Sequence, residues 1–179
     1  MVDAFLTAAG ENACGTHGPH PGDAAADLAV QLATRYADGH AVVLTDEPTI
    51  VDLDLEARLR AAGAAPLRPT DRDWRAALPN AGAAITGCVL AVAATGHVVV
   101  AAGPGTPRAA SLAPPAHICL VHAERVVPTI GDALAVLDAG DLPSALIWVG
   151  GPSRTSDLEM RPTIGVHGPR TVDLIVISA

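Results

Sequence analysis

Two short polar stretches near the end of the chain hold the residues best suited to bind an anion. Residues 150–157 follow the apolar segment 145–149, and residues 166–170 come ten residues later. Paired glycines let successive backbone N–H groups point to one side, hydroxyls add donors, and arginine adds positive charge. The sequence therefore predicts an anion-binding pocket formed by Gly150, Gly151, Ser153, Arg154, Thr155, Ser156, His167 and Arg170.

A second interpretation of the same residues stays open. Ser153 and Asp157 are also typical turn residues, and Arg154 could pair with Asp157 or Glu159 on the surface. The possible proton carriers in this region are Asp157, Glu159 and His167, which is a small set for general acid–base catalysis. No catalytic residue is assigned.

Other motifs favour no metal or nucleotide site. The segment 103–108 lacks the last glycine of a dinucleotide fingerprint and contains prolines, so it is expected only to form one wall of a pocket. Cys14, His17 and His20 are spaced like part of a metal site but lack a fourth ligand. We expect no metal and no cofactor in this chain.

The composition excludes several classes of function. There are 11 basic and 19 acidic residues, and only 2% of residues are aromatic, which argues against nucleic acid as a partner. No lysine occurs, so lysine Schiff bases and a Walker-type phosphate lysine are excluded. Three widely spaced cysteines favour neither disulfides nor an iron–sulfur cluster in this chain, and no export signal is visible, so a cytoplasmic location is expected.

The elements that would position the pocket follow from the apolar pattern. Helices are predicted from Asp23, as N-cap, to about 37, from about 52 to 62, over 70–78 and over 130–138. Strands are predicted over 41–44, 117–121, 145–149 and 172–177, with two more in the uncharged segment 83–103, which we interpret as a strand pair and not a membrane span.

These strands are apolar on both faces and alternate with helices, which predicts a single α/β domain with a mainly parallel sheet covered by helices on both faces. Residues 1–22 are expected to form a flexible N-terminal arm, and residues 23–179 the domain. Ligands of parallel α/β sheets gather at the carboxyl ends of strands. The loop after 145–149 is expected at such an end.

Several segments of the chain resemble the LUD-domain family, specifically its lactate-utilisation protein C members. The resemblance rests on residues 151–159 and 165–170 and extends upstream through 85–88, 94–97, 103–105, 114–118 and 125–129. It implies a fold similar to the sugar-phosphate isomerase and coenzyme A-transferase superfamily. The same segments provide candidate wall residues for the pocket: Thr86, Gly87, Thr95, Gly96, His97, Gly103 and Gly105.

The resemblance also implies a role in oxidising L-lactate to pyruvate beside partner subunits that carry iron–sulfur clusters. An accessory or substrate-handling subunit that binds a small anionic metabolite is the first hypothesis. The alternatives are a stand-alone transferase or isomerase acting on such a metabolite, and a structural scaffold. One departure is notable: the family commonly has an acidic residue before the Thr-Gly turn and a hydroxyl residue after it, where this chain has Ala94 and His97.

Overall fold

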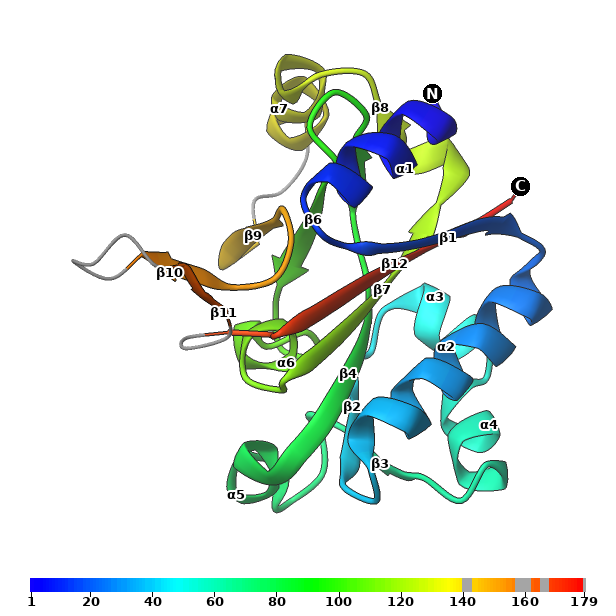
Figure 1. The fold of residues 1–179 in the computed structure, drawn as a ribbon. Helices are drawn as coiled ribbons and strands as arrows, with labels where there is room; N and C mark the ends of the chain where they lie inside the picture. The colour runs from blue at the N-terminus through cyan, green and yellow to red at the C-terminus, as the bar shows by residue number, and fades with distance from the viewer. Residues whose placement is uncertain (140–142, 157–161, 165–167, 179) are drawn as a thin grey trace.

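The computed structural model describes residues 1–139, 143–156, 162–164 and 168–178; for 154–156 and 162–164 it describes the backbone alone. Figure 1 shows the arrangement of the elements.

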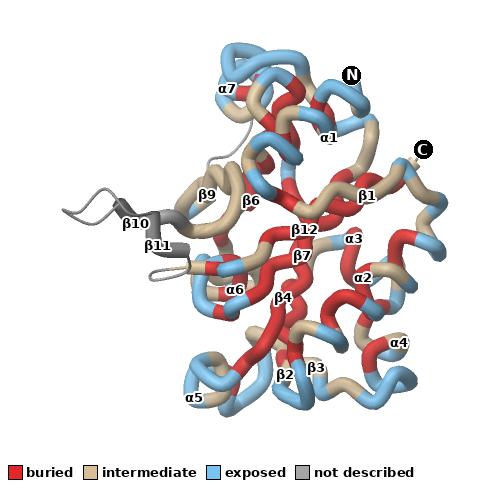
Figure 2. Tube along the Cα trace, in the orientation of Figure 1, coloured by how far each residue is buried: buried red, intermediate tan, exposed pale blue. Residues whose placement is uncertain are grey.

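Six strands, all parallel, form the central sheet. In spatial order they are β1 (Gly15–His20), β12 (Thr171–Ile177), β7 (Ala116–His122), β4 (Ala81–Gly87), β2 (Ala41–Leu44) and β3 (Ala65–Leu67). Nearly every residue of β4, β7 and β12 is buried, as the tube in Figure 2 shows. Continuous apolar runs are typical of strands covered on both faces, and the predicted fold class is confirmed.

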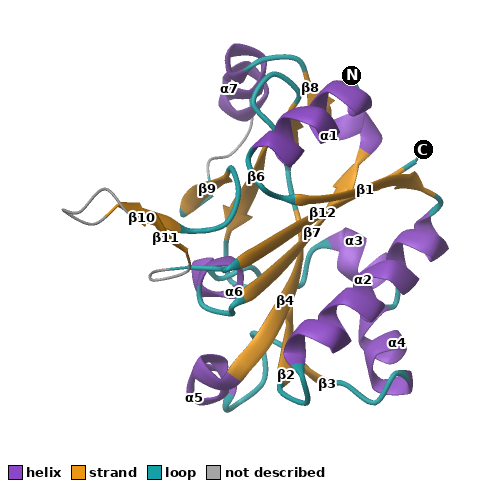
Figure 3. Cartoon of the chain, viewed as in Figure 1, coloured by secondary structure: helices purple, strands orange, loops and turns teal. Residues whose placement is uncertain are grey.

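Helices cover one face of the sheet (Figure 3). These helices are α2 (Gly22–Ala37), α3 (Pro48–Asp52) and α4 (Leu55–Ala61). Their apolar side chains pack on alternate residues of the strands, such as Ile118 and Leu120 of β7 and Ile175 of β12. Alternation puts the intervening residues, such as Cys119 and Leu174, on the other face.

The other face is covered by helices and by a second sheet. The helices are α1 (Val2–Glu11), α5 (Trp74–Ala77) with the 3-10 turn η1 (Leu78–Asn80), and α6 (Arg108–Leu112). The second sheet has the order β8 (Val126–Val127), β5 (Leu90–Val92), β6 (His97–Ala102) and β9 (Ala145–Val149). Helix α7 (Ile130–Asp138) packs against this sheet through Ala133, and η2 (Ala123–Arg125) precedes β8.

The strand before the predicted anion loop belongs to this second sheet. β9 runs antiparallel to β6, with Val98 opposite Val149 and Ala102 opposite Ala145. The prediction that residues 145–149 extend the parallel sheet is therefore wrong, because a strand's pairing partner is decided by contacts distant in the sequence. The uncharged segment 83–103 holds β4 in the main sheet and the β5–β6 hairpin in the second. Among the described residues, no helix has both the length and the apolar character needed to cross a bilayer.

The first twenty residues are built into the domain. Residues 15–20, expected to lack regular structure, form β1 and pair in parallel with β12 at the edge of the sheet. An edge position suits Pro19, because proline has no N–H to donate and an edge strand is paired on one side only. Phe5 and Ala9 of α1 are fully buried in the core. The predicted flexible arm is wrong for these elements, since long-range packing supplies what local propensity lacks.

The other helices differ from the predictions mainly at their ends. Pro21 and not Asp23 precedes the first residue of α2, and Asp23 instead pairs with Arg58. The helix predicted from about 52 to 62 corresponds to α4, and the preceding helix α3 was not predicted. Asp54, with a left-handed backbone conformation (φ 49°), separates the two. The helix predicted over 70–78 is reduced to α5 and η1, whereas α7 has its predicted bounds.

Candidate functional site

Part of the predicted anion loop lines a cavity of about 160 Å³. Gly150, Gly151 and Ser153 reach it from the end of β9. The remaining lining residues are mostly apolar and come from β9, α6 and the segment before β12: Ile147, Trp148, Val149, Ser111, Leu112, Gly168 and Pro169. The structure therefore brings three of the predicted residues to one concave surface.

Packing accounts for both glycines of this loop. A Cβ atom at Gly150 would lie 2.3 Å from Nε2 of His97, and one at Gly151 would lie 2.4 Å from the carbonyl oxygen of Asn12. Gly151 also has a φ of 137°, which side chains rarely tolerate. The backbone N–H of Ser153 donates to the carbonyl oxygen of Pro169 at 2.8 Å. That N–H group is therefore already used, which leaves fewer backbone donors for an anion than the sequence suggests.

For the other predicted pocket residues, the structure describes only part of each residue or none of it. Arg154, Thr155 and Ser156 form β10 (Arg154–Ser156), which pairs antiparallel with β11 (Pro162–Ile164), and only their backbone is described. His167 lies outside the described residues. Arg170 is exposed, and its backbone N–H donates to the carbonyl oxygen of Pro115 at 2.7 Å. Anion binding by these residues stays a prediction.

The predicted wall residues divide between different places. Gly96, with a φ of 66°, lies under α1, where a Cβ would come within 2.3 Å of the Ala9 nitrogen, and the Thr95 carbonyl accepts a hydrogen bond from Asn12. His97, next in the chain, contacts Gly150. Thr86 is buried, and its hydroxyl lies 2.9 Å from Nε2 of His117. None of these four residues is among the described residues that line the cavity of Ser153.

The remaining wall residues adjoin a second cavity, at the carboxyl ends of the parallel strands. Gly87 ends β4 and contacts Glu47, Gly105 contacts Asp46, and Gly103 forms a bridge with Thr106. The cavity measures about 170 Å³. Its lining comes from the loops after β2, β4 and β7 and from β6 and the turn after it: Glu47, Pro48, Cys88, Val89, Ala101, Thr106 and Arg125. We refer to it as the strand-end cavity.

Glu47 is the carboxylate of the strand-end cavity. It lies in the segment between β2 and α3, and its carboxylate accepts a hydrogen bond from the Thr45 hydroxyl. Burial raises its pKa, although hydrogen bonds from Thr45 and from the Gly87 backbone act in the opposite direction. Among the described residues, no cation lies within ion-pair distance of Glu47.

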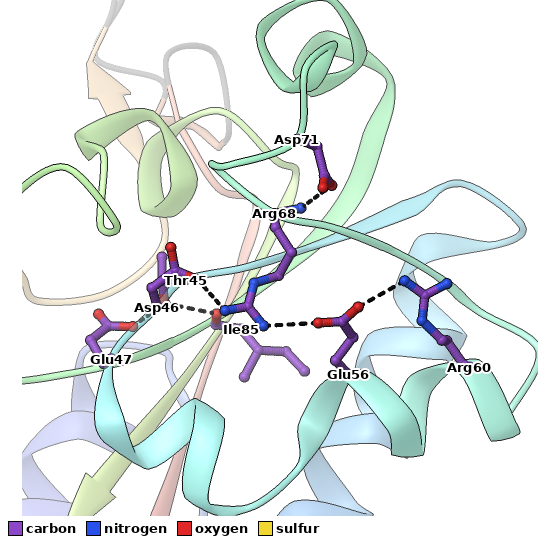
Figure 4. A network of polar contacts seen from close by, with 8 residues as sticks. All are labelled: Thr45, Asp46, Glu47, Glu56, Arg60, Arg68, Asp71 and Ile85. Atoms are coloured by element: carbon purple, nitrogen blue, oxygen red, sulfur yellow. Dashed lines mark hydrogen bonds and ion pairs between the residues drawn. The ribbon is translucent and has the colours of Figure 1, made fainter.

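The neighbouring carboxylate has a structural role instead. Asp46 forms an ion pair with Arg68, which also contacts Glu56 at 3.0 Å. Figure 4 shows this network, with Glu47 on the opposite side of Asp46 from Arg68. The charge of Asp46 is therefore balanced within the fold, whereas Glu47 lines the cavity without an ion-pair partner among the described residues.

Arg125 is the cation of the strand-end cavity. It ends η2, is exposed at the cavity, and donates from Nη1 to the carbonyl oxygen of Cys88 at 2.9 Å. Sequence reasoning missed both Glu47 and Arg125, which are far apart in the chain. The polar run Thr45-Asp46-Glu47, directly after the predicted strand 41–44, was the available signal.

The three cysteines pack in the core, and His17 has a carboxylate partner. Cys14, Cys88 and Cys119 belong to one hydrophobic cluster. A hydrogen bond to Cys88, together with burial, raises the pKa of the Cys119 thiol, so this group stays protonated. His17 pairs with Asp173. In the described part of the chain, no three His, Cys, Asp or Glu side chains are grouped as metal ligands would be.

Comparisons with known proteins agree with this architecture. The family model of the LUD domain matches residues 24–177. A solved structure, a DUF162 family protein from Deinococcus radiodurans, superposes with a TM-score of 0.65 over 98% of this chain and 95% of that one. Its sequence identity is 24%, so this similarity concerns the fold.

Curated relatives share parts of the sequence. Lactate utilization protein C of Deinococcus radiodurans is 38% identical over 105 residues, which cover 57% of this chain and 49% of the relative. The chain thus spans about half the length of that relative. Lactate utilization protein C of Geobacillus kaustophilus is 31% identical over 170 residues, which cover 86% of this chain and 70% of that protein. Because the family model matches nearly all of the chain, the protein belongs to the LUD domain family.

Proposed function

We propose that this chain takes part in lactate utilisation as an accessory or substrate-handling subunit that binds a small anionic metabolite. The names of the curated relatives support the lactate role. The main support for substrate handling is the cavity lined by Gly150, Gly151 and Ser153. Arg154 follows Ser153 directly in the chain and would supply the positive charge for an anion.

The proposal includes partner subunits that hold iron–sulfur clusters. Oxidation of L-lactate to pyruvate releases an electron pair, which requires an acceptor. The cysteines of this chain pack in its hydrophobic core, so we assign the acceptor clusters to other subunits. Affinity purification of this chain from its native cells should recover an iron–sulfur protein, and the isolated chain should not reduce a dye with lactate. Lactate-dependent dye reduction by the chain alone would contradict the accessory role.

Arg154→Ala tests the loop as the anion site. A hydrogen bond to a charged group contributes about 1.5–3 kcal/mol, so the substitution should weaken binding of lactate, pyruvate or phosphate roughly 10- to 150-fold. Isothermal titration, with folding checked by thermal melting, measures this. Arg72→Ala, at an exposed position, is the control and should bind as wild type does. Equal binding by wild type and Arg154→Ala would remove Arg154 from the site.

The alternative is a stand-alone transferase or isomerase. The strand-end cavity favours it, because this cavity places a carboxylate and a guanidinium at the end of the sheet where α/β enzymes bind ligands. Turnover of a small anionic metabolite by the purified chain without partners would favour this alternative over the accessory subunit.

A further inference from the structure

The strand-end cavity lies where the order of the parallel strands reverses. From β2 the chain continues to β3 at one edge of the sheet, whereas from β4 it continues to β7 and then β12 in the opposite direction. The connections also separate: α3 and α4 pack on one face, and α6 packs on the other. Divergent connections leave a crevice outside the carboxyl ends of the two central strands, and ligands of open α/β sheets bind there. Glu47 and Pro48 follow β2, and Cys88 and Val89 follow β4.

The cavity holds two opposite charges that the fold does not pair. Glu47 and Arg125 both line it, yet among the described residues neither makes an ion pair with the other or with any third group. Other charged groups near the helices are paired, such as Asp46 with Arg68 and Asp27 with Arg58. Glu47 is half-buried and accepts hydrogen bonds from the Thr45 hydroxyl and the Gly87 backbone, but no cation among the described residues balances its charge. Withdrawing a charge from water without a counter-ion is costly, so this arrangement suggests a ligand-binding role.

We propose that the strand-end cavity binds a small carboxylic acid that carries a hydroxyl or carbonyl oxygen beside its carboxylate, with the carboxylate on Arg125 and the neighbouring oxygen on Glu47. Arginine presents several N–H groups in one plane, and one hydrogen bond to Cys88 leaves others for a carboxylate. The glutamate carboxyl group accepts from a ligand hydroxyl when ionised and donates to a carbonyl when protonated.

Three further features suit this class of ligand. One water molecule needs roughly 10–15 Å³ of cavity space, so a cavity of about 170 Å³ has room for a small organic acid. Burial of Glu47 favours its protonated form, which reduces repulsion between its carboxyl group and an incoming carboxylate. Thr106 lies in the same lining and adds a hydroxyl. The site is separate from the loop cavity and does not depend on the proposed function, which determines only the choice of probes.

The test is isothermal titration of L-lactate, pyruvate and acetate into the full chain. Acetate keeps the carboxylate but lacks the second oxygen, so it should bind more weakly than the other two acids. Arg125→Gln should weaken binding of all three by about 10-fold or more, the loss expected for a hydrogen bond to a charged group. Glu47→Met keeps the chain length without a hydrogen-bonding group and should remove the preference for lactate and pyruvate over acetate. Exposed Arg75→Gln and Glu124→Gln are the matched controls and should bind as wild type does.

Backbone amide shifts of the wild-type protein provide a measurement that needs no variant. Addition of L-lactate should shift the amide signals of Val89, Thr106 and Arg125. Shifts confined to Gly150, Gly151 and Ser153, with Arg125→Gln binding as wild type does, would overturn this inference and support the loop site. Loss of binding in Arg125→Gln with unchanged binding in Arg154→Ala would support the strand-end cavity and contradict the loop site. Absence of binding by all three acids would overturn the inference, while co-purification with an iron–sulfur protein could still hold.

Discussion

Nε2 of His17 lies 2.7 Å from Oδ1 of Asp173, which joins the edge strand β1 to the buried strand β12. The second carboxylate oxygen of Asp173 accepts from the Tyr36 hydroxyl of α2 at 2.9 Å. Burial, followed by this hydrogen bond, raises the pKa of Tyr36. Three elements therefore meet at Asp173, a residue that is only 3% exposed.

His17→Ala should destabilise the protein by about 1–3 kcal/mol, because it leaves one oxygen of a buried carboxylate without its partner. Urea unfolding followed by circular dichroism measures the change. His40→Ala, at an exposed position, is the control and should stay within about 0.5 kcal/mol of wild type. Equal stability of both variants would mean that the His17–Asp173 contact does not hold β1 on the sheet.

Gly96→Ala should destabilise the protein by at least about 1–2 kcal/mol from backbone conformation alone, since Gly96 is left-handed with a φ of 66°. The new methyl group would also meet the backbone of α1 at 2.3 Å. Gly10→Ala is the matched control, because Gly10 lies in α1 with open space around it, and it should stabilise by roughly 0.5–1 kcal/mol. Thermal melting distinguishes the two, and a stable Gly96→Ala variant would contradict the close packing of α1 on this turn.

His117 should make the protein sensitive to mild acid. Burial lowers its pKa from 6.5 to about 4, so between these values the unfolded chain binds a proton that the folded protein does not. Stability is therefore lost as the pH falls through this window, by roughly 3 kcal/mol for this residue.

The His117→Gln variant tests this assignment. Gln cannot titrate but can still hydrogen-bond Thr86, so the variant should lose less stability than wild type between about pH 7 and about pH 4.5. Urea unfolding at both pH values measures the difference. Parallel losses in the two proteins would show that His117 is not the group responsible.

Glu47 should have the opposite effect with pH. Its pKa is raised above the ordinary value of 4.5 by burial, so the folded protein holds the proton more tightly than the unfolded chain does. Its contribution to stability is fully present below 4.5 and is lost as the pH rises through the raised pKa. Relative to Glu47→Gln, wild type should therefore lose stability between about pH 4 and about pH 8 in urea unfolding. If the difference in stability between the two proteins does not change with pH, folding does not raise the pKa of Glu47.

The sequence alone was sufficient to predict those helices and strands whose apolar pattern matches their burial in the fold. The strands β7 and β12, the helices α2 and α7 and the α/β class were all predictable, because continuous apolar runs indicate strands buried on both faces, and a 3.6-residue period indicates a helix against them. The family was identified from segments whose residues are close together in the chain.

Only the tertiary structure decided how distant segments meet. Residues 15–20 form a strand because β12 offers a partner, although their glycines and proline disfavour one locally. Val149 ends a strand of the second sheet and not of the parallel sheet, which moves Gly150 away from the parallel strand ends. Glu47 and Arg125 reach one cavity only because β2, β4 and β7 are neighbours or near neighbours in the sheet. A sequence pattern reports which residues are buried, whereas the partner of each strand depends on the free energy of the whole packed chain.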